Sequence, residues 1–220
     1  VEIRPLETRS HAAEITIDGQ AATVTLEAVF FNPNNQQLEG TYFFPLPANV
    51  AVSQFSMFIN GKEQKGELLD ATKARQIYED IVRRMKDPGL LEFVGLQMIK
   101  VRVFPIMPNS EVKVRLSYQH LVEKDSGMYS FRYPLASAMP DDKKPIGQVT
   151  LKVNLSAKIA LKNIYSPTHT IDKTMKGDFN AVVGFEGKSV LPERDFVLYW
   201  AEAEEEIGAS LLTHRPAGEQ

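Results

Sequence analysis

The sequence predicts a mainly β fold, built as antiparallel β-sandwich modules with one inserted helix. Three observations support this prediction. Apolar and polar residues alternate with a period of two in several stretches, as is typical of strands with one buried face. Asn60-Gly61 separates two extended runs, and this dipeptide favours a tight hairpin turn between antiparallel strands. Residues 71–86 instead have the apolar spacing of an amphipathic helix.

The strand signal is clearest at residues 111–119, EVKVRLSYQ, where Val112, Val114, Leu116 and Tyr118 alternate with polar residues. The same pattern occurs in ATVTLEAVF and in QVTLKVNLS. Because one face of each stretch is apolar and the other polar, we expect half-exposed strands in antiparallel sheets. Further strands are expected at IKVRV, MYSFRY, DFNAVVGF and DFVLYWAE, which cover residues 99–103, 128–133, 178–185 and 195–202.

The stretch YFFPLP, residues 42–47, places Pro45 and Pro47 inside the most apolar run of the chain. Proline cannot donate a ladder hydrogen bond, so we expect the strand to leave the sheet after Phe44. Pro45, Leu46 and Pro47 would then form a structural corner, with Leu46 filling the core between the prolines. The run is too apolar to be left exposed as a polyproline recognition motif.

The predicted helix begins after Asp70, which can cap it, and ends before Pro88-Gly89. Its apolar face comprises Ala74, Ile77, Tyr78, Ile81, Val82 and Met85. Its other face holds a basic cluster, a candidate surface for a polyanion such as a sulfated glycan. A solvated face of mixed charge is the alternative, since acidic residues interrupt the cluster. The cluster comprises Lys73, Arg75, Arg83, Arg84 and Lys86.

Length and composition limit the class of protein. A chain of 220 residues can bury a substantial core, and we expect two closely packed modules. The boundaries expected are 1–125 for the first β module, 126–205 for a second β-rich connector, and 206–220 for a linker. A net charge of −3 gives no basic footprint for nucleic acid. No apolar run is long enough for a membrane helix, so the sequence predicts no membrane insertion by this stretch.

Catalytic and metal-binding motifs are missing from the sequence. It contains no G-x-S-x-G, no H-E-x-x-H, no phosphate-binding glycine loop and no cysteine. The four histidines have no ligand spacing, and we expect each at the surface or at a strand edge. We therefore predict no enzyme activity, no cofactor and no metal site; Asp141-Asp142 would be the first place to look for a bound cation. The histidines are His11, His120, His169 and His214.

The order of these features resembles the VIT domain of inter-alpha-trypsin inhibitor heavy chains and of the vault poly-ADP-ribose polymerase. The shared features are a strand ending in Phe30-Phe31-Asn32, then YFFPLP, a strand to INGK, a helix with ARQIYED, LLE, and FPIMPNSEVKVRLSYQHL. The resemblance covers about residues 1–121. It implies a β-rich, non-catalytic module that precedes a von Willebrand factor A-type domain, here expected after Gln220. A short chain without cysteine is similar to bacterial members of the family, some of them exported.

The resemblance makes the leading hypothesis a non-enzymatic interaction or scaffolding module of an exported or envelope-associated protein. It would position a downstream von Willebrand A-type adhesion domain; its protein, matrix or envelope partner is not defined by the sequence. The alternative is a β-sandwich that binds a carbohydrate or polyanion. For a carbohydrate, exposed aromatics would form the platform, and solvent exposure distinguishes the two hypotheses. The candidates are Tyr129, Tyr133, Tyr165 and Trp200. A hydrolase whose site assembles from distant residues is a third possibility.

Overall fold

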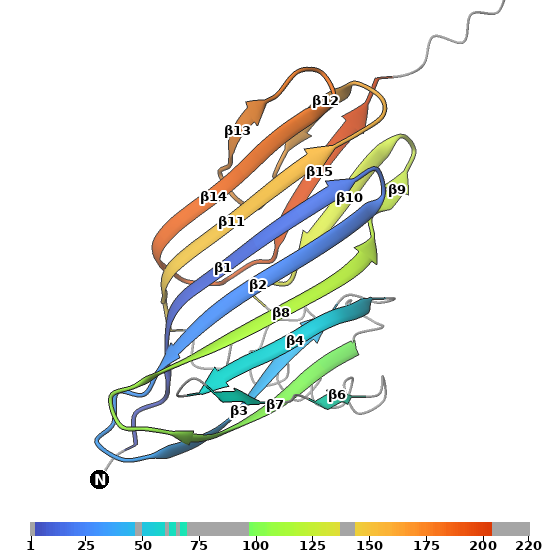
Figure 1. Ribbon diagram of the computed structural model, residues 1–220. Helices are drawn as coiled ribbons and strands as arrows, with labels where there is room; N and C mark the ends of the chain where they lie inside the picture. The colour runs from blue at the N-terminus through green and yellow to red at the C-terminus, as the bar shows by residue number, and fades with distance from the viewer. Residues whose placement is uncertain are drawn as a thin grey trace, which may run out of the picture.

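The computed structural model describes residues 3–46, 50–59, 62–64, 67–69, 97–136 and 144–203, and these residues form strands, turns and loops (Figure 1). The chain is mainly β, as predicted. The strands are β1 Glu7–Asp18, β2 Ala21–Phe31, β3 Leu38–Leu46, β4 Ala51–Ile59, β5 Lys62–Gln64, β6 Glu67–Leu69, β7 Gln97–Ile106, β8 Glu111–Leu121, β9 Glu123–Asp125, β10 Met128–Tyr133, β11 Ile146–Ser156, β12 Leu161–Tyr165, β13 Asp172–Met175, β14 Asn180–Val190 and β15 Phe196–Glu202.

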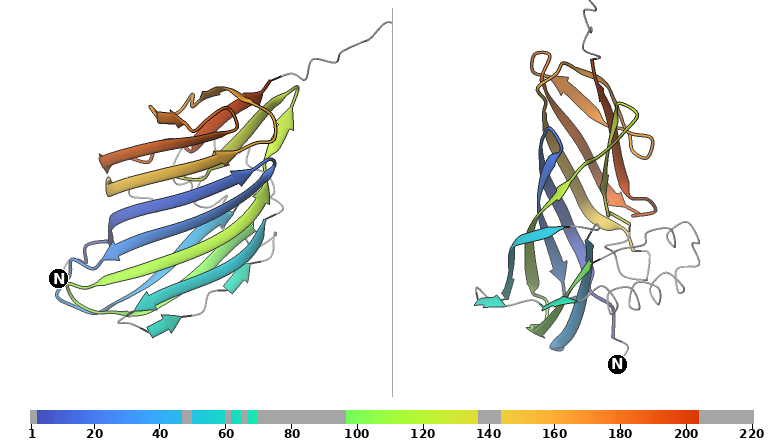
Figure 2. Two further views of the ribbon diagram at one scale, coloured as in Figure 1. Left: turned by 45° about the horizontal axis from the view of Figure 1, so that its top comes forward. Right: turned by 90° about the vertical axis from the view of Figure 1, so that its right-hand side faces the viewer.

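The strands form an eight-stranded, a four-stranded and a three-stranded sheet. The eight-stranded sheet has the order β13-β14-β11-β1-β2-β8-β4-β5, the four-stranded sheet β12-β15-β10-β9, and the three-stranded sheet β3-β7-β6. Both smaller sheets lie on the same side of the large sheet, which we call its inner side (Figure 2). Ring contacts show this: Phe44 of β3 packs against Tyr118 of β8, and Phe131 of β10 packs against His120 of β8.

One pairing departs from the predicted antiparallel arrangement. β1 and β11 are parallel neighbours, with Ser10 opposite Gln148 and Asp18 opposite Ser156. The pair joins a strand of the predicted first module to a strand of the predicted second module, and both contribute to one buried cluster. The boundary near residue 125 stays a prediction, but the two parts share one sheet. A sandwich of antiparallel sheets also stays a prediction, since one large sheet faces two small ones.

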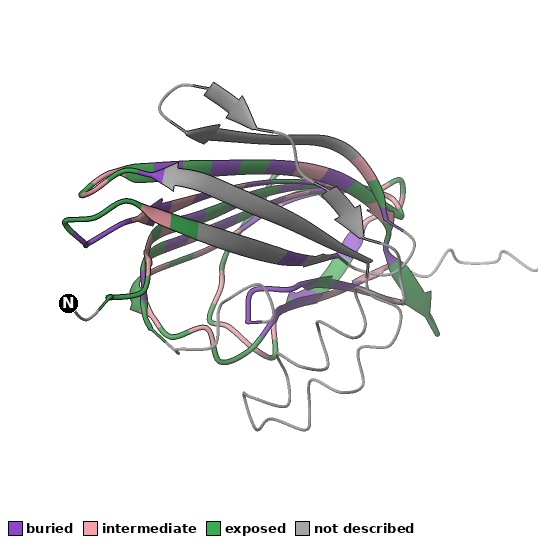
Figure 3. Ribbon diagram, turned by 90° about the horizontal axis from the view of Figure 1, so that it is seen from below, coloured by how far each residue is buried: buried purple, intermediate pink, exposed green. Residues whose placement is uncertain are grey.

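Alternation along the strands determines which side chains face the core. In β1, Ala13, Ile15 and Ile17 are buried, whereas Ala12 and Glu14 are exposed. The same alternation in β2, β8 and β11 gives the large sheet one apolar and one polar face, and Figure 3 shows buried and exposed segments alternating along its strands. The sequence analysis did not predict β1, β6, β9, β12 or β13, although β1 has a clear period-two signal.

β3 shows how the prolines are accommodated. The strand continues beyond Phe44, and Pro45 and Leu46 pair with Met98 and Gln97 of β7. The prediction that the strand leaves the sheet after Phe44 is therefore wrong by two residues. The physical reason is that β3 is an edge strand. One side of an edge strand has no neighbouring strand, so proline, which lacks an N–H group, is tolerated there. Leu46 is fully buried, while Pro47 lies outside the described residues, so the corner itself stays a prediction.

Other predictions fall partly or wholly outside the described residues. The helix predicted over residues 71–86 lies outside them, and so do Asn60 and Gly61. The strands on either side of that dipeptide do pair antiparallel, with Ile59 of β4 opposite Lys62 of β5. This pairing is the one that the hairpin prediction requires.

Asn32, directly after β2, ties the end of this strand to two loops. Its amide nitrogen donates to the carbonyl oxygens of Gln36, Ile106 and Met107 at 3.0 to 3.1 Å, and its amide oxygen accepts from the backbone and side chain of Asn34. The side-chain oxygen of Asn34 in turn accepts from the backbone N–H of Arg4, and its amide nitrogen donates to the Arg4 carbonyl. Asn32 is completely buried, so these bonds replace those that water would make.

Candidate interaction face

The outer face of the eight-stranded sheet is its polar side. Its residues are those that alternate with the buried core positions, and neither of the smaller sheets lies on this side (Figures 1 and 2). In the four central strands they are mostly charged, hydroxyl or amide side chains. The central members are Ala12, Glu14 and Thr16 of β1, Thr23, Thr25 and Glu27 of β2, Lys113, Arg115 and Ser117 of β8, and Thr150, Lys152 and Asn154 of β11.

The register of the strands places opposite charges beside each other on this face. Glu27 lies opposite Arg115, and its carboxylate accepts from Arg115 at 2.8 Å and from Lys113 at 2.9 Å. Across the parallel pair, Glu14 lies opposite Lys152, and its carboxylate is 3.4 Å from that ammonium and 3.2 Å from the Asn154 amide. Pairs of this kind hold long side chains in defined positions, although exposed pairs add little stability.

Glu27 is the most strongly held of these carboxylates. The hydrogen bond from Lys113 lowers its pKa, partial burial opposes this effect, and the Arg115 hydrogen bond and the two positive charges lower the pKa further. The carboxylate therefore stays ionised at neutral pH. A fixed anion with two cations beside it can recognise polar and charged groups of another molecule, because its geometry is set before binding.

A shallow hollow of about 510 Å³ lies between these pairs, and Ala12 is one of the residues that line it. Ala12 is opposite Glu27 on one side and Thr150 on the other. Because alanine is the smallest side chain in this row, the longer residues around it form a rim. The rim and floor are made by Ala13, Glu14, Thr25, Leu26, Glu27, Arg115, Ser117, Thr150 and Lys152.

A second hollow, of about 420 Å³, lies beside the loop between β12 and β13. Its polar groups mostly bond one another or nearby backbone. The Ser166 hydroxyl accepts from the backbone of His169, the Thr168 hydroxyl accepts from the backbone of Val197, and Lys173 donates to the carbonyl of Ile164. These contacts hold the loop and leave few groups free for a ligand.

Most of the site residues predicted from the sequence lie outside the part of the chain that the structure describes. Lys73, Arg75, Arg83, Arg84 and Lys86 lie outside the described residues, as do Asp141 and Asp142. Within the described part of the chain, no three histidine or acidic side chains are grouped as metal ligands. Nor does that part contain a helix that could cross a membrane.

The aromatic residues proposed as a sugar platform do not form one. Tyr129, Tyr133 and Trp200 are at most 5% exposed, and only Tyr165 is at the surface, with 46% exposure. Tyr129 stacks on Trp200 with parallel rings 5.2 Å apart, and its hydroxyl donates to Glu202. These contacts are core packing between β10 and β15.

The histidine prediction is wrong for His11, which is fully buried on β1. Its Nε2 is 2.6 Å from the hydroxyl of Tyr133 on β10. Burial lowers the pKa of His11 to about 4, so the ring is neutral at physiological pH. The alternation of β1 could have predicted this, because His11 is in phase with Ala13, Ile15 and Ile17.

Sequence reasoning did not identify Glu14, Glu27, Arg115 and Lys152 as a group. Alternation shows that each faces solvent, but they come from four strands that are up to 138 residues apart in the chain. Only the register brings them to one place, and the parallel pairing of β1 with β11 has no local signal in the sequence.

Comparisons with known proteins cover much of the chain. The family model described as vault protein inter-alpha-trypsin domain matches residues 8–118. Human inter-alpha-trypsin inhibitor heavy chain H6 is 23% identical over 159 residues, which are 72% of this chain and 12% of that protein. Human von Willebrand factor A domain-containing protein 5A is 28% identical over 133 residues, which are 59% of this chain and 17% of that protein. The chain thus spans less than a fifth of the length of these two relatives.

A solved structure shares the fold over most of the chain. A putative nutrient binding protein from Legionella pneumophila superposes with a TM-score of 0.62 at 14% sequence identity, covering 89% of this chain and 67% of that one. At this identity the likeness concerns the fold alone. The strand arrangement described above, including the strands after residue 118, therefore recurs in a protein of known structure.

Proposed function

The chain belongs to the VIT domain family, and from this we propose that it is a non-enzymatic protein-interaction module that docks a von Willebrand A-type domain of the same polypeptide on the outer face of its eight-stranded sheet. The partner is suggested by the relatives, since one of them is named for a von Willebrand factor A domain and matches this chain over only 17% of its length. The export or envelope association of the whole protein, and its adhesive role, belong to the same proposal.

The observation that carries the proposal is the hollow at Ala12 between two pre-formed ion pairs. The face offers both signs of charge, with Glu14 and Lys152 on one side and Glu27 and Arg115 on the other. A mixed-charge, hydrogen-bonding surface suits a folded protein partner, whose own surface carries both signs. It suits a uniformly charged polymer poorly, because the carboxylates would repel a polyanion.

The carbohydrate-binding and polyanion-binding alternatives have weaker support. The carbohydrate alternative required exposed aromatics, and three of its four candidates are buried. The polyanion alternative depends on residues 73–86, outside the described part of the chain.

The test is binding between this chain and the separately purified A-type domain of the same polypeptide. A tethered partner acts at an effective concentration of about 1 mM, so calorimetry or NMR titration should extend to that range. We expect Ala12→Arg to weaken binding at least about tenfold, since the arginine fills the hollow and adds charge there. Ala12 is exposed, so the substitution should leave thermal unfolding nearly unchanged.

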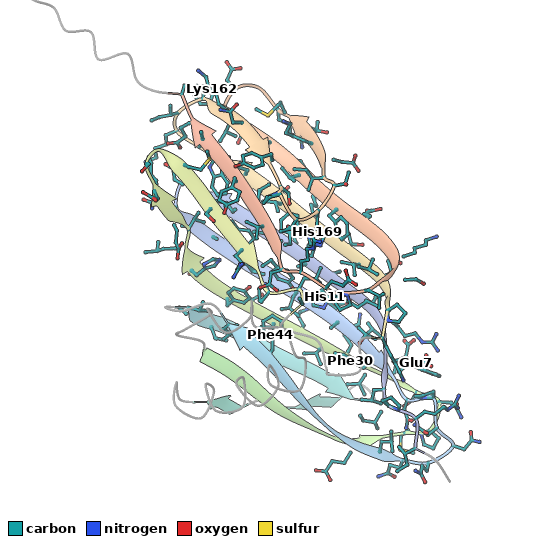
Figure 4. All side chains as sticks on the ribbon, turned by 180° about the vertical axis from the view of Figure 1, so that it is seen from behind. Glu7, His11, Phe30, Phe44, Lys162 and His169 are labelled. Atoms are coloured by element: carbon teal, nitrogen blue, oxygen red, sulfur yellow. The ribbon has the colours of Figure 1, made fainter. Side chains whose placement is uncertain are left out.

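The matched control is Lys162→Glu, a charge change at an exposed position of β12 in the four-stranded sheet (Figure 4). This variant should bind like the wild type. Equal binding by Ala12→Arg and wild type would reject the outer face as the docking surface, and no binding by the wild type at millimolar concentration would reject the A-type domain as the partner.

A further inference from the structure

Three of the four histidines lie where the eight-stranded sheet meets the four-stranded sheet. His11 of β1 contacts the Tyr133 hydroxyl of β10 at 2.6 Å, and the His120 ring of β8 lies 5.4 Å from the Phe131 ring of β10. His169, in the loop after β12, has its ring between those of Phe185 on β14 and Phe196 on β15, at 4.7 and 5.6 Å. We call His11, His120 and His169 the histidine seam; Figure 4 labels two of its members.

The seam histidines contact the opposite sheet through side chains; farther along, Leu161 N of β12 donates to the Asp178 carbonyl, and Lys173 of β13 donates to the Ile164 carbonyl of β12. No strand of the four-stranded sheet pairs with a strand of the eight-stranded sheet. Separating the two sheets would therefore break no ladder hydrogen bonds, although it would expose apolar side chains such as Phe131 and Leu198. At neutral pH the free-energy cost of exposing these side chains keeps the sheets together, since each large apolar side chain strongly favours burial.

The seam has little capacity to accept protons while it is closed. His11 Nδ1 and His120 Nε2 are buried without a hydrogen-bond partner, and His11 Nε2 faces a hydroxyl. An imidazolium needs an acceptor at each N–H, and burying the charge without one is costly. The closed seam therefore favours the neutral form at His11 and His120.

The pKa values agree with this geometry. Burial lowers the pKa of all three histidines, that of His11 to about 4. A hydrogen bond with the backbone of Leu121 opposes the effect at His120. At His169 the charge of Arg194 lowers the pKa further and that of Asp195 raises it.

Several other polar groups contact the seam, among them the Thr168 hydroxyl, which is 2.9 Å from Nδ1 of His169. The Tyr118 ring packs against His120, and the Tyr133 hydroxyl contacts His11. Asp195 accepts from the backbone of Ala136, and its carboxylate is 4.0 Å from Arg132. The acidic group that acts on the seam is thus Asp195, at His169.

We propose that the histidine seam is an acid-sensitive joint, at which the four-stranded sheet separates from the eight-stranded sheet on acidification. The small sheet, with its apolar face uncovered, then opens its own strand pairing, while the eight-stranded sheet keeps its pairing. In the separated state the rings are hydrated and take up protons near pH 6.5, their ordinary pKa. Consider a histidine that is neutral in the closed state and protonated in the open state. For each such histidine, the ratio of open to closed molecules rises by up to tenfold for each unit by which the pH falls. Three such histidines together favour opening by at most about a thousandfold per pH unit.

Native-state hydrogen exchange on the intact chain tests this proposal. Protection factors for backbone amides of β10 and β15 report the four-stranded sheet, and those of β1 and β2 report the centre of the large sheet. Between pH 7.5 and pH 5.0 we expect protection of β10 and β15 to fall at least tenfold more than that of β1 and β2. A parallel fall in all four strands would overturn the proposal, because acid would then be unfolding the whole chain.

Two variants separate titration from simple weakening. His11→Gln keeps a nitrogen near Tyr133 but cannot take up a proton. The change in β10 protection per pH unit should therefore be smaller than in the wild type, by a factor of up to ten. Tyr133→Phe removes the hydroxyl and leaves His11 able to titrate, so β10 protection should fall at both pH values with the pH dependence retained. A wild-type pH dependence in His11→Gln would exclude His11 as a proton acceptor of the joint.

Discussion

Gly147 of β11 lies directly against the backbone of Arg9, at the start of the parallel pairing between β1 and β11. A Cβ atom at position 147 would stand 2.5 Å from the carbonyl oxygen of Arg9. The contact is with backbone, which cannot rotate away as a side chain could. This close approach allows two strands from distant parts of the chain to lie side by side.

We therefore expect Gly147→Ala to destabilise the chain by roughly 1 to 3 kcal/mol, the usual range for overpacking. The matched control is Gly184→Ala in β14, where an added Cβ would meet no atom within 4 Å. Chemical denaturation of both variants measures the difference. Equal stability of the two would show that β1 and β11 can move apart freely at this point.

Asn32→Asp should lower the free energy of unfolding more than the small change in side-chain size suggests. The aspartate keeps the shape of the side chain but loses both N–H groups, which are shared among three carbonyl oxygens, and places a carboxylate against them. We expect a loss of about 3 kcal/mol or more, because buried acceptors are left unpaired and a charge is buried.

The control for this substitution is Asn163→Asp, an exposed position with a φ of 51°, which both residue types tolerate. This variant should unfold at nearly the wild-type temperature. Similar losses from Asn32→Asp and Asn163→Asp would mean that the Asn32 bonds contribute no more than a surface residue does.

Leu46→Ala tests whether the residue between the two prolines fills the core. Leu46 is fully buried in the main apolar cluster, so truncation should cost roughly 2 to 5 kcal/mol. Leu121→Ala provides the comparison, since Leu121 is 75% exposed and its truncation should change the unfolding free energy by less than about 0.5 kcal/mol. If Leu46→Ala left stability intact and removed partner binding, the PLP stretch would be a recognition element.

Glu27→Gln tests the ion pairs of the outer face. The pKa of Glu27 is lowered in the folded chain, first by the Lys113 hydrogen bond, so the stabilisation is present above the unfolded pKa and is lost as pH falls through the folded value. We expect a loss below about 1 kcal/mol at neutral pH, because the pair is partly exposed.

The difference between Glu27→Gln and wild type should shrink on acidification and in high salt. Urea denaturation at neutral and acidic pH measures it, with Glu193→Gln at an exposed position as control. A difference that stays constant with pH would show that the carboxylate charge is not the cause.

Local patterns were sufficient for much of the fold. Alternation in residues 22–30, 111–119 and 148–156 predicted β2, β8 and β11 together with their buried faces, because a strand exposes side chains to two sides in turn. The ordered motifs around Asn32 and YFFPLP were specific enough to indicate the family. The same reasoning could have predicted β1 and the burial of His11.

Apart from the β4–β5 hairpin, tertiary structure decided which strands are neighbours, and with that the candidate interaction face and the histidine seam. The pairing of β1 with β11 depends on backbone hydrogen bonds between segments more than a hundred residues apart, and backbone groups are the same in every residue. Glu14 and Lys152 therefore carry no sequence mark of their proximity. Pro45 could remain in β3 because β3 is an edge strand, and a strand's position in a sheet is a property of the assembled fold.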